Sequence, residues 1–421
     1  MTRNQRAALW IAAIIGVGVL SAWLFQRPIG MWLFDRAVER GVARDPLATL
    51  PDGLHVGLCG TGSPLPARER AASCTVVIAG KAMFVVDAGE GAARNISLMG
   101  LPNGQIRALF LTHFHSDHID GMGPMMLLRW TASGNRSPLP VHGPTGVEGV
   151  IAGFNAAYAL DNGYRTAHHG AEITPPAAAG AVAVPFDVPA SPTVVYDAGG
   201  LRVTAFAVDH RPVRPSVGYR FDYKGRSVVI SGDTARSKTL ETAAKGADLL
   251  IHEALQPKMV KTLAAQLDKV GRKQTAQIMR DILDYHASPA QAADSARTAG
   301  VKMLVLSHVV PSMPSPYLDA AFLDGAEDHF DGPIVVGEDG EYFSLPAKGT
   351  AVVLTSGGPI AWAAASLLAD SFDARTDLWL RLNPVSINTG VSTVVCGARG
   401  TTLVSFNAHD HLTAPDLLTY R

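Results

Sequence analysis

A cluster of histidines with one aspartate is the clearest chemical signal in the sequence. Directly after the apolar run Ala108–Leu111, the chain reads Thr-His-Phe-His-Ser-Asp-His and ends this motif at His118. His113 and His115 are two residues apart, so on an extended backbone both imidazoles point the same way and can bind one metal ion. Asp117 and His118 follow where the chain turns and can reach a second ion. A solvated polar loop is the alternative, and three histidines with an aspartate make it the weaker interpretation.

More ligands have to come from later in the chain, because these four side chains are too few to complete two metal sites. Each candidate should stand at the end of a strand. A single polar residue in such a place is usually ordinary, but three of them together supply the missing ligands. They are His210 at the end of 201–209, Asp233 after 227–230 and His308 after 301–306.

Short motifs in a fixed order surround these ligands. They are Gly60-Thr-Gly-Ser-Pro64, Val86-Asp-Ala-Gly-Glu-Gly91, Thr112–His118, Val208–His210, Gly218–Arg220, Ser231–Thr234, His252–Ala254, His286–Ser288 and Leu306–His308. In this order they resemble the metallo-β-lactamase superfamily and, within it, the ribonuclease Z-like branch, from about Leu54 to Pro346. The resemblance implies an α/β fold, an αββα sandwich whose strand ends meet at the metals.

The resemblance also implies a dinuclear zinc centre, in which manganese or iron(II) could replace zinc. A metal lowers the pKa of its bound water to about 7, so a metal-bridged hydroxide could attack an ester near neutral pH, with Asp117 orienting it. The implied ligands are His113, His115 and His210 for the first ion, Asp117, His118 and His308 for the second, and Asp233 as the bridge.

By the same resemblance, His286 is the candidate general acid that protonates the leaving oxygen. It stands in a His-Ala-Ser triplet where the family has His-Ser-Thr, and the missing hydroxyl weakens this assignment. The alternative is that His286 caps the helix that begins at Pro289. His252 and Glu253 end a predicted strand, and we expect them to support His286 or a ligand rather than to bind metal.

The substrate is less specified than the chemistry. In ribonuclease Z an inserted arm that grips transfer RNA lies between the Gly-Tyr-Arg and Ser-Gly-Asp-Thr motifs, whereas here only Phe221–Ile230 separates them. The net charge of −1 gives no broad attraction for polyanions. We therefore expect a small-molecule ester or phosphodiester substrate and disfavour nucleic acid. A tRNA 3′-end endoribonuclease is the alternative, and a noncatalytic membrane-anchored metal-binding protein is a third, weaker one.

The N-terminal segment suggests membrane attachment. Arg3 and Arg6 precede Ala7–Phe25, an uncharged run long enough for a transmembrane helix. Trp23 and its neighbours leave no small-residue cleavage site, so an uncleaved anchor is favoured over a signal peptide. The positive residues would stay in the cytoplasm, which predicts an inner-membrane anchor with the catalytic body in the periplasm, or an exported protein.

The rest of the chain divides by composition and pattern. With 421 residues, 47% of them apolar, the chain can bury a sizeable core. We expect an anchor or signal over 1–28, a connecting helix and linker over 29–50 and the hydrolase domain over 51–347. Within that domain, the Pro/Ala/Gly-rich stretch Pro175–Pro192 predicts a loop or flap. The three cysteines lack a zinc-binding spacing and predict small buried residues, with one disulfide as an alternative.

The tail over 348–421 predicts a small α/β appendage outside the hydrolase. Val352–Ile360, Asn388–Val395 and Leu403–Asn407 resemble the C-terminal portion of histidine phosphatases of the phosphoglycerate mutase type. That family's catalytic half, with its Arg-His-Gly motif, is missing, so we expect a fragment without its own active site. Its strand-like runs must bury their apolar faces on the hydrolase or on a second copy of the chain, as in a homodimer.

Overall fold

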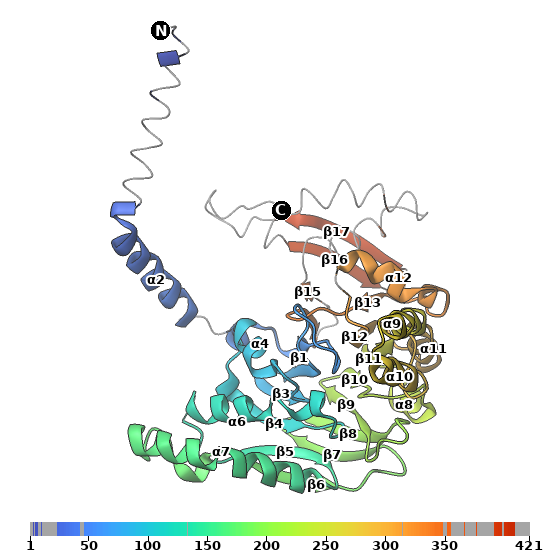
Figure 1. Cartoon of the computed structure of the whole chain (residues 1–421), viewed down its shortest axis with the longest axis horizontal. Helices are drawn as coiled ribbons and strands as arrows, with labels where there is room; N and C mark the ends of the chain where they lie inside the picture. Colours follow the sequence, from blue (N-terminus) through green and yellow to red (C-terminus); the bar gives the residue numbers. More distant parts are fainter. Residues whose placement is uncertain are drawn as a thin grey trace. The chain divides into compact units, whose positions relative to one another are not determined.

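The structure is a computed structural model of the chain, and it divides into two units, residues 1–49 and 50–421 (Figure 1). We describe each unit by itself. The residues described are 3, 5–6, 10, 23–42, 46–132, 134–313, 315–347, 352–354, 366, 376, 391–397 and 400–408.

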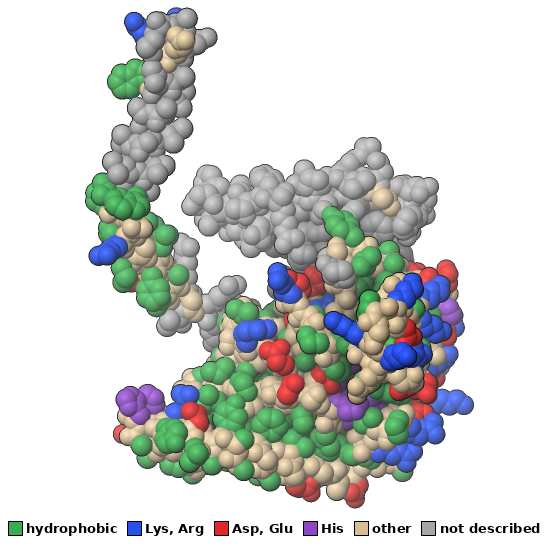
Figure 2. Space-filling view, in the orientation of Figure 1, with side chains coloured by type: hydrophobic (Ala, Val, Ile, Leu, Met, Phe, Trp, Pro, Cys, Tyr) green, Lys and Arg blue, Asp and Glu red, His purple; other side chains and the backbone are tan. Residues whose placement is uncertain are grey.

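The first unit contains the helices α2 (Gln26–Val42) and α3 (Pro46–Thr49). Side chains of α2 such as Trp32 and Phe34 are exposed, and Figure 2 shows hydrophobic groups along this helix. Most of the predicted span Ala7–Phe25 lies outside the described residues. Among the residues that are described, no helix is both long and apolar enough to span a bilayer, so the predicted transmembrane helix lacks support.

The second unit is built on two large β-sheets. The first sheet has the strand order β15 (Val352–Leu354), β14 (Tyr342–Pro346), β1 (Gly53–Gly60), β2 (Cys74–Ala79), β3 (Ala82–Val86), β4 (Ile106–Phe110), β5 (Leu139–Pro144) and β6 (Ala181–Phe186). The second has the order β13 (Ile334–Val336), β12 (Leu304–Val310), β11 (Leu249–Leu255), β10 (Arg226–Ile230), β9 (Val217–Tyr223), β8 (Leu201–Ala207) and β7 (Thr193–Ala198).

The two sheets pack face to face and share one apolar core. Phe110 of the first sheet contacts Tyr219 and Phe221 of the second, with ring centroids 5.4 and 5.6 Å apart. The central strands are buried on both faces, which is why they are rich in Val, Ile and Leu. This packing fixes the strand ends of both sheets relative to each other, which is what a site shared between the sheets requires.

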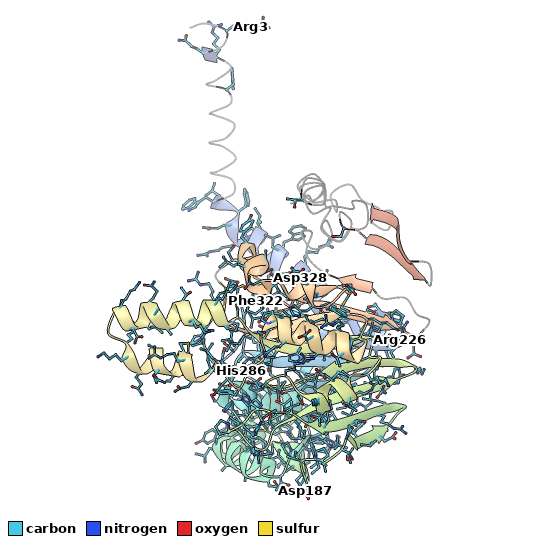
Figure 3. The ribbon with its side chains drawn as sticks, turned by 90° about the vertical axis from the view of Figure 1, so that its right-hand side faces the viewer. Arg3, Asp187, Arg226, His286, Phe322 and Asp328 are labelled. Atoms are coloured by element: carbon cyan, nitrogen blue, oxygen red, sulfur yellow. A yellow bond between two sulfur atoms is a disulfide. The ribbon has the colours of Figure 1, made fainter. Side chains whose placement is uncertain are left out.

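Helices cover the outer faces of the sheets (Figure 1). Against the first sheet lie α4 (Ala92–Leu98), α6 (Met122–Thr131) and α7 (Val147–His169), and the short α5 (Ser116–Ile119) follows β4. Against the second lie α8 (Lys238–Ala243), α11 (Pro289–Ala299) and α12 (Asp319–Leu323). The helices α9 (Pro257–Lys269) and α10 (Lys273–Asp281) pack on each other and project from the body (Figure 3). The predicted α/β sandwich with two sheets and outer helices is confirmed.

The predicted loop over Pro175–Pro192 is partly wrong. Ala181–Phe186 forms β6, which pairs in parallel with β5 at the edge of the first sheet. Pro185 is compatible with this position because an edge strand can leave one side of its backbone unpaired. The composition of the stretch is typical of a loop, but pairing with β5 overrides it.

Cys59 and Cys74 are buried and joined by a disulfide between the neighbouring strands β1 and β2. The prediction that these cysteines are small buried groups rather than zinc ligands agrees with this arrangement. A disulfide leaves no thiolate for a metal, so metal binding in this domain depends on imidazole and carboxylate groups.

The tail starts as part of the first sheet. Its strand β15 pairs antiparallel with β14, and β16 (Val391–Gly397) pairs with β17 (Gly400–Ala408) in a separate two-stranded sheet. The other tail residues of the proposed phosphatase resemblance lie outside the described part, apart from 366 and 376.

Deleting residues 349–421 is expected to leave metal content and turnover largely intact, because every predicted ligand lies between His113 and His308. The deletion removes β15 and leaves β14 as an unpaired sheet edge, so we expect a loss of solubility or a change of oligomeric state. Metal analysis, turnover and size-exclusion elution of the truncated protein test this. A truncated protein that stays folded and metal-loaded but loses turnover would show that the tail contributes to the active site.

Candidate dinuclear metal centre

The first half of the site is delivered by the turn between β4 and α5. His113 and His115 stand in the extended segment after β4, and Asp117 and His118 lie in the first turn of α5. The side chain of Asp87, one residue after β3, accepts hydrogen bonds from the backbone N–H and the hydroxyl of Thr112, both at 2.8 Å. This fixes the loop that carries the histidines.

The second half of the site comes from the ends of strands in the second sheet. His210 follows β8, and Asp233 follows β10, as the sequence predicted. His308 differs, because it lies inside β12 rather than after it. The pairing of β11 with β12 shifts at this point, leaving His308 as an extra residue with φ of 47°. Such a bulge redirects a side chain, and here it turns His308 toward Asp117 and Asp233.

The structure brings all seven predicted ligands together. In the first group, His113 Nε2 is 3.0 Å from His115 Nδ1 and 3.8 Å from Asp233 Oδ2. His210 Nε2 is also 3.8 Å from Asp233 Oδ2, and its Nδ1 contacts the carbonyl oxygen of Tyr285 at 3.0 Å. These four ligand atoms all lie within 4.8 Å of one another, which suits one metal ion.

The second group shares Asp233 with the first. His308 Nε2 is 3.1 Å from Asp117 Oδ2 and 3.4 Å from Asp233 Oδ2. His118 Nε2 is 3.5 Å from Asp117 Oδ2 and 3.3 Å from Asp233 Oδ1. Asp233 therefore lies between the two groups: its Oδ2 faces His113, His210 and His308, and its Oδ1 faces His118.

Several buried atoms of this cluster have no hydrogen-bond partner among the described residues. They include His118 Nε2, His210 Nε2 and Asp233 Oδ1. Burying a polar atom without a partner costs free energy, and a lone pair aimed at a shared point is the arrangement that a cation satisfies. The residues present therefore fit a divalent metal, in agreement with the metal binding that the fold implies.

The pKa values of the cluster shift in opposite directions. Burial holds the pKa of the His113 imidazole well below its usual value. Burial also opposes the charged ring of His308, but the charge of Asp233 and the hydrogen bond to Asp117 outweigh it and raise its pKa to about 9. For Asp233, the charges of His308 and His118 outweigh burial and keep its pKa well below the usual range. Metal ligands must be deprotonated, so metal loading should displace protons from this cluster.

His286 and Glu253 form a buried pair beside the metal ligands. Glu253 Oε1 accepts from the backbone N–H of Thr234 and of Ala287, both at 3.1 Å, and contacts His286 Nδ1 at 3.0 Å. Burial disfavours the charged imidazole, but the charge and hydrogen bond of Glu253 outweigh it and raise the pKa of His286 above its usual value. The helix α11 is capped by Ser288 instead, so His286 does not serve as its cap. His252 is fully buried and contacts the carbonyl oxygen of Glu253.

Asp87 is a site residue that the sequence analysis missed. Its Oδ2 is 2.8 Å from His118 Nδ1, so it fixes the orientation of that imidazole and its lone pair at Nε2. Asp87 is buried and has φ of 57°, a conformation that Asp and Asn tolerate better than most residues. An Asp after an apolar strand carries no sequence signal for this role beyond its place in the Val-Asp-Ala-Gly motif.

Replacing Asp87 with asparagine should weaken metal binding by about 10- to 100-fold, as is typical for partners that orient a ligand. Asparagine keeps the size and suits the backbone conformation, but its amide nitrogen cannot accept the proton of His118 or the hydroxyl of Thr112. Metal titration with a chelating indicator measures the loss. The matched control is Asp197→Asn, an exposed residue that pairs with Arg202. Unchanged metal affinity in the Asp87 variant would contradict this role.

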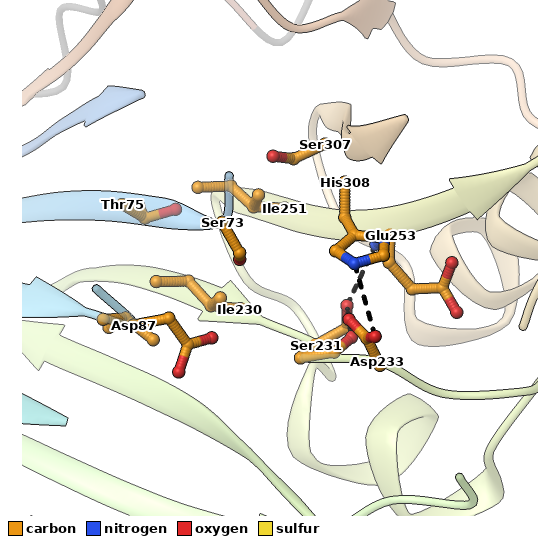
Figure 4. Close-up of a pocket in the computed structure, with 12 residues that line it drawn as sticks. Ser73, Thr75, Asp87, Ile230, Ser231, Asp233, Ile251, Glu253, Ser307 and His308 are labelled. Atoms are coloured by element: carbon orange, nitrogen blue, oxygen red, sulfur yellow. Dashed lines mark hydrogen bonds and ion pairs between the residues drawn. The ribbon is translucent and has the colours of Figure 1, made fainter. Parts of the chain in front are cut away.

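A narrow pocket lies next to the cluster, between the two sheets (Figure 4). Ser73 and Asp87 line it from the first sheet, and Asp233, Glu253 and His308 line it from the second. The picture shows His308 directed at Asp233, with Glu253 beside them. The pocket is thus lined both by the predicted metal ligands Asp233 and His308 and by Asp87 and Glu253, which contact His118 and His286.

Comparison with known proteins gives one consistent result. Residues 83–309 match the model of the β-lactamase superfamily domain. Ribonuclease Z of Mycolicibacterium gilvum is 37% identical over 289 residues, which cover 68% of this chain and 94% of that protein. Ribonuclease Z of Mycobacterium bovis is 36% identical over 291 residues, covering 68% and 96%. The short form of human tRNase Z shares the fold at 23% identity, with a TM-score of 0.50 over 69% of this chain and 99% of that one.

The fold and the buried imidazole–carboxylate cluster define a metal-dependent hydrolase that acts on ester or phosphodiester bonds. The chain belongs to the metallo-β-lactamase superfamily and, within it, to the ribonuclease Z family. The phosphatase resemblance of the tail, the domain boundaries and the exported location stay predictions.

The predicted partner is wrong. We expected a small-molecule ester and disfavoured nucleic acid, but the relatives that match most of this domain are ribonucleases. Two arguments misled the prediction. The net charge of −1 averages over 421 residues and conceals local clusters of cations. The missing arm was also given too much weight, because the 37% identity to a ribonuclease Z extends over 94% of that protein.

Proposed function

We propose that this protein is an endoribonuclease of the ribonuclease Z type that cleaves a phosphodiester bond of RNA, with 3′-extended precursor tRNA as its substrate. The observation that carries the proposal is the 37% identity to a ribonuclease Z over 94% of that enzyme's length. The cluster of seven ligands supports the chemistry, because it lies within the matched region. Sequence identity over a whole domain is stronger support than the absence of one inserted arm.

We further propose that the metals are zinc ions. His113, His115 and His210 would hold one ion, Asp117, His118 and His308 the other, and Asp233 both. Imidazole and carboxylate ligands without thiolates suit zinc, although manganese and iron(II) accept the same donors. When bound, a pair of such ions supplies a nucleophilic water near neutral pH and stabilises charge on the phosphate oxygens. Elemental analysis of protein purified without added metal identifies the ions.

The chain's own contribution to the reaction is proton delivery. Glu253 holds His286 through Nδ1, which leaves Nε2 as the nitrogen that can carry a proton toward a leaving oxygen. The ring of His286 stacks near that of His308, with centroids 5.6 Å apart, so it stands at the edge of the ligand cluster. The side chain of His286 is only 7% exposed, so a proton there is shielded from bulk water. The raised pKa of His286 favours the protonated form that a general acid needs.

The decisive test offers the purified protein two substrates in parallel. One is a 3′-extended precursor tRNA with mapped product ends, and the other is bis(p-nitrophenyl) phosphate, a chromogenic phosphodiester. We expect a single endonucleolytic cut near the 3′ end of the tRNA body, lost on chelation and restored by metal. Hydrolysis of the chromogenic ester without cleavage of the precursor would overturn the ribonuclease proposal and leave the hydrolase assignment standing.

A further inference from the structure

The helices α9 and α10 form a hairpin that begins and ends close to the site. Gln256 accepts a hydrogen bond from the backbone N–H of Lys258 at the start of α9, and Pro257 stands in the first turn. The chain turns at Val270–Arg272, returns along α10 and runs through Tyr285 into His286. Figure 3 shows the hairpin reaching outward from the body at the level of His286.

The hairpin is amphipathic, and its apolar side is used by the fold. Val260, Ala264 and Met279 are buried against Leu255 and Val310 at the ends of β11 and β12. This contact anchors both helices to the strands that carry Glu253 and His308. The opposite side of the hairpin therefore remains available for binding without cost to the core.

Cations dominate the exposed side. From residue 257 to 284 the sequence holds six Lys or Arg and three Asp, in a chain whose net charge is −1. Two of the cations are paired, Lys258 with Asp324 and Arg280 with Asp268. The other four form no side-chain hydrogen bond or ion pair with any residue that the structure describes, and all are exposed. This hairpin cation cluster consists of Lys261, Lys269, Arg272 and Lys273.

The cluster adds no ion pair to the described part of the fold, and its like charges repel each other. Figure 2 shows Lys and Arg side chains over α9 and α10. By contrast, the β9–β10 connection is only a short turn, and its cation Lys224 is already paired with Asp52. The α9–α10 hairpin is thus a projecting element next to the site with unpaired cations. The β9–β10 turn does not project, and its Lys224 is already paired.

We propose that the hairpin cation cluster binds the phosphate backbone of the RNA substrate at a distance from the bond that is cut. This inference rests on the proposed ribonuclease function. The 13 residues of α9 span about 20 Å at the helical rise of 1.5 Å per residue. Three members of the cluster, Lys269, Arg272 and Lys273, lie at its far end and therefore contact a different part of the substrate from the part in the metal site. A small ester reaches only the metal site, but a folded RNA can touch both.

The test compares two triple variants with the same loss of charge. The hairpin variant is Lys269→Ala/Arg272→Ala/Lys273→Ala. The control is Arg107→Ala/Lys238→Ala/Lys245→Ala, three exposed cations of β4 and the α8 region whose side chains likewise have no described partner. Binding of fluorescently labelled mature tRNA, which lacks the 3′ extension, is followed by anisotropy over a series of salt concentrations. Turnover of bis(p-nitrophenyl) phosphate is measured on the same proteins.

We expect the hairpin variant to bind tRNA on the order of tenfold more weakly at low salt. Its slope of log affinity against log salt should fall by about 1 for each phosphate contact that is lost. The control variant should keep the affinity and slope of the unmodified protein, and the chromogenic ester should be turned over equally by all three proteins.

Two results would overturn the inference. One is an equal loss of tRNA affinity in both variants, or in neither. The other is a loss of chromogenic turnover in the hairpin variant, which would show that the mutations disturb the site. Phosphatidylserine vesicles are assayed in parallel, and a loss of vesicle binding with intact tRNA binding would assign the cluster to a membrane instead. The binding assay needs no cleavage, so failure of the proposed ribonuclease activity is seen separately.

Discussion

Asp233→Ala is expected to abolish hydrolysis and to lower the metal content of the protein. The carboxylate contacts His113, His118, His210 and His308, so both ligand groups lose the member that they share. Loss of a residue that only orients a ligand typically costs 10- to 100-fold. Removal of a ligand common to two ions should cost more, at least about 10³-fold in turnover.

The result is read from turnover and from elemental analysis of the same preparation. Asp209→Ala is the control, because Asp209 precedes the ligand His210 but its carboxylate pairs with the exposed Arg211. A circular dichroism spectrum shows whether each variant folds. Full turnover in the Asp233 variant, with two metal ions per chain, would contradict the assignment of the whole centre.

His286→Ala should spare metal binding and slow the reaction selectively. A general acid contributes typically 10²–10⁴-fold, and only where the departing oxygen needs a proton. An RNA phosphodiester has a poor leaving group, whereas p-nitrophenolate leaves without help. We therefore expect a loss of about 10²-fold or more for RNA and a small loss for the chromogenic ester. His286 touches Glu253 and is close to His308, so metal content must be measured in parallel.

His329→Ala is the matched control for this variant. His329 is partly exposed and hydrogen-bonded to Asp294, away from the ligand set. Glu253→Gln should show the same selectivity in weaker form, because it removes the charge that favours the protonated imidazole. Equal slowing of both substrates by His286→Ala, or loss of metal, would mean that His286 holds the site together rather than protonating the leaving group.

Much of the site could be predicted from sequence because its ligands follow strands. The motif that ends at His118 comes directly after the apolar run of β4, and Asp233 comes directly after that of β10. Apolar runs identify strands in the sequence and so show where each strand ends. Side chains that follow the strands meet at one edge when the two sheets pack together. Asp87 follows the same pattern, but a lone aspartate has too many other uses for its spacing to identify it.

Other features depend on tertiary contacts that no local pattern shows. The position of His308 inside β12 rests on a shift in pairing with β11, which requires both strands. The strand β6 forms in a segment rich in Pro and Ala because β5 offers it an edge. The net charge does not reveal the hairpin cation cluster, because it sums over the whole chain. Electrostatic attraction between exposed charges instead acts within a Debye length of about 10 Å.

The origin of the ligands in two different sheets gives the metal centre a mechanical role. His113, His115, Asp117 and His118 belong to the chain around β4, and His210, Asp233 and His308 belong to the second sheet. Among the described residues, the two sheets are held together at this edge by apolar packing and by hydrogen bonds such as that from Tyr219 to the carbonyl oxygen of Leu111. Bound cations would link the two sheets, because each sheet contributes ligands to the same centre. Binding to the folded state alone stabilises that state by mass action, so bound metal should raise the free energy of unfolding of the domain as well as support catalysis.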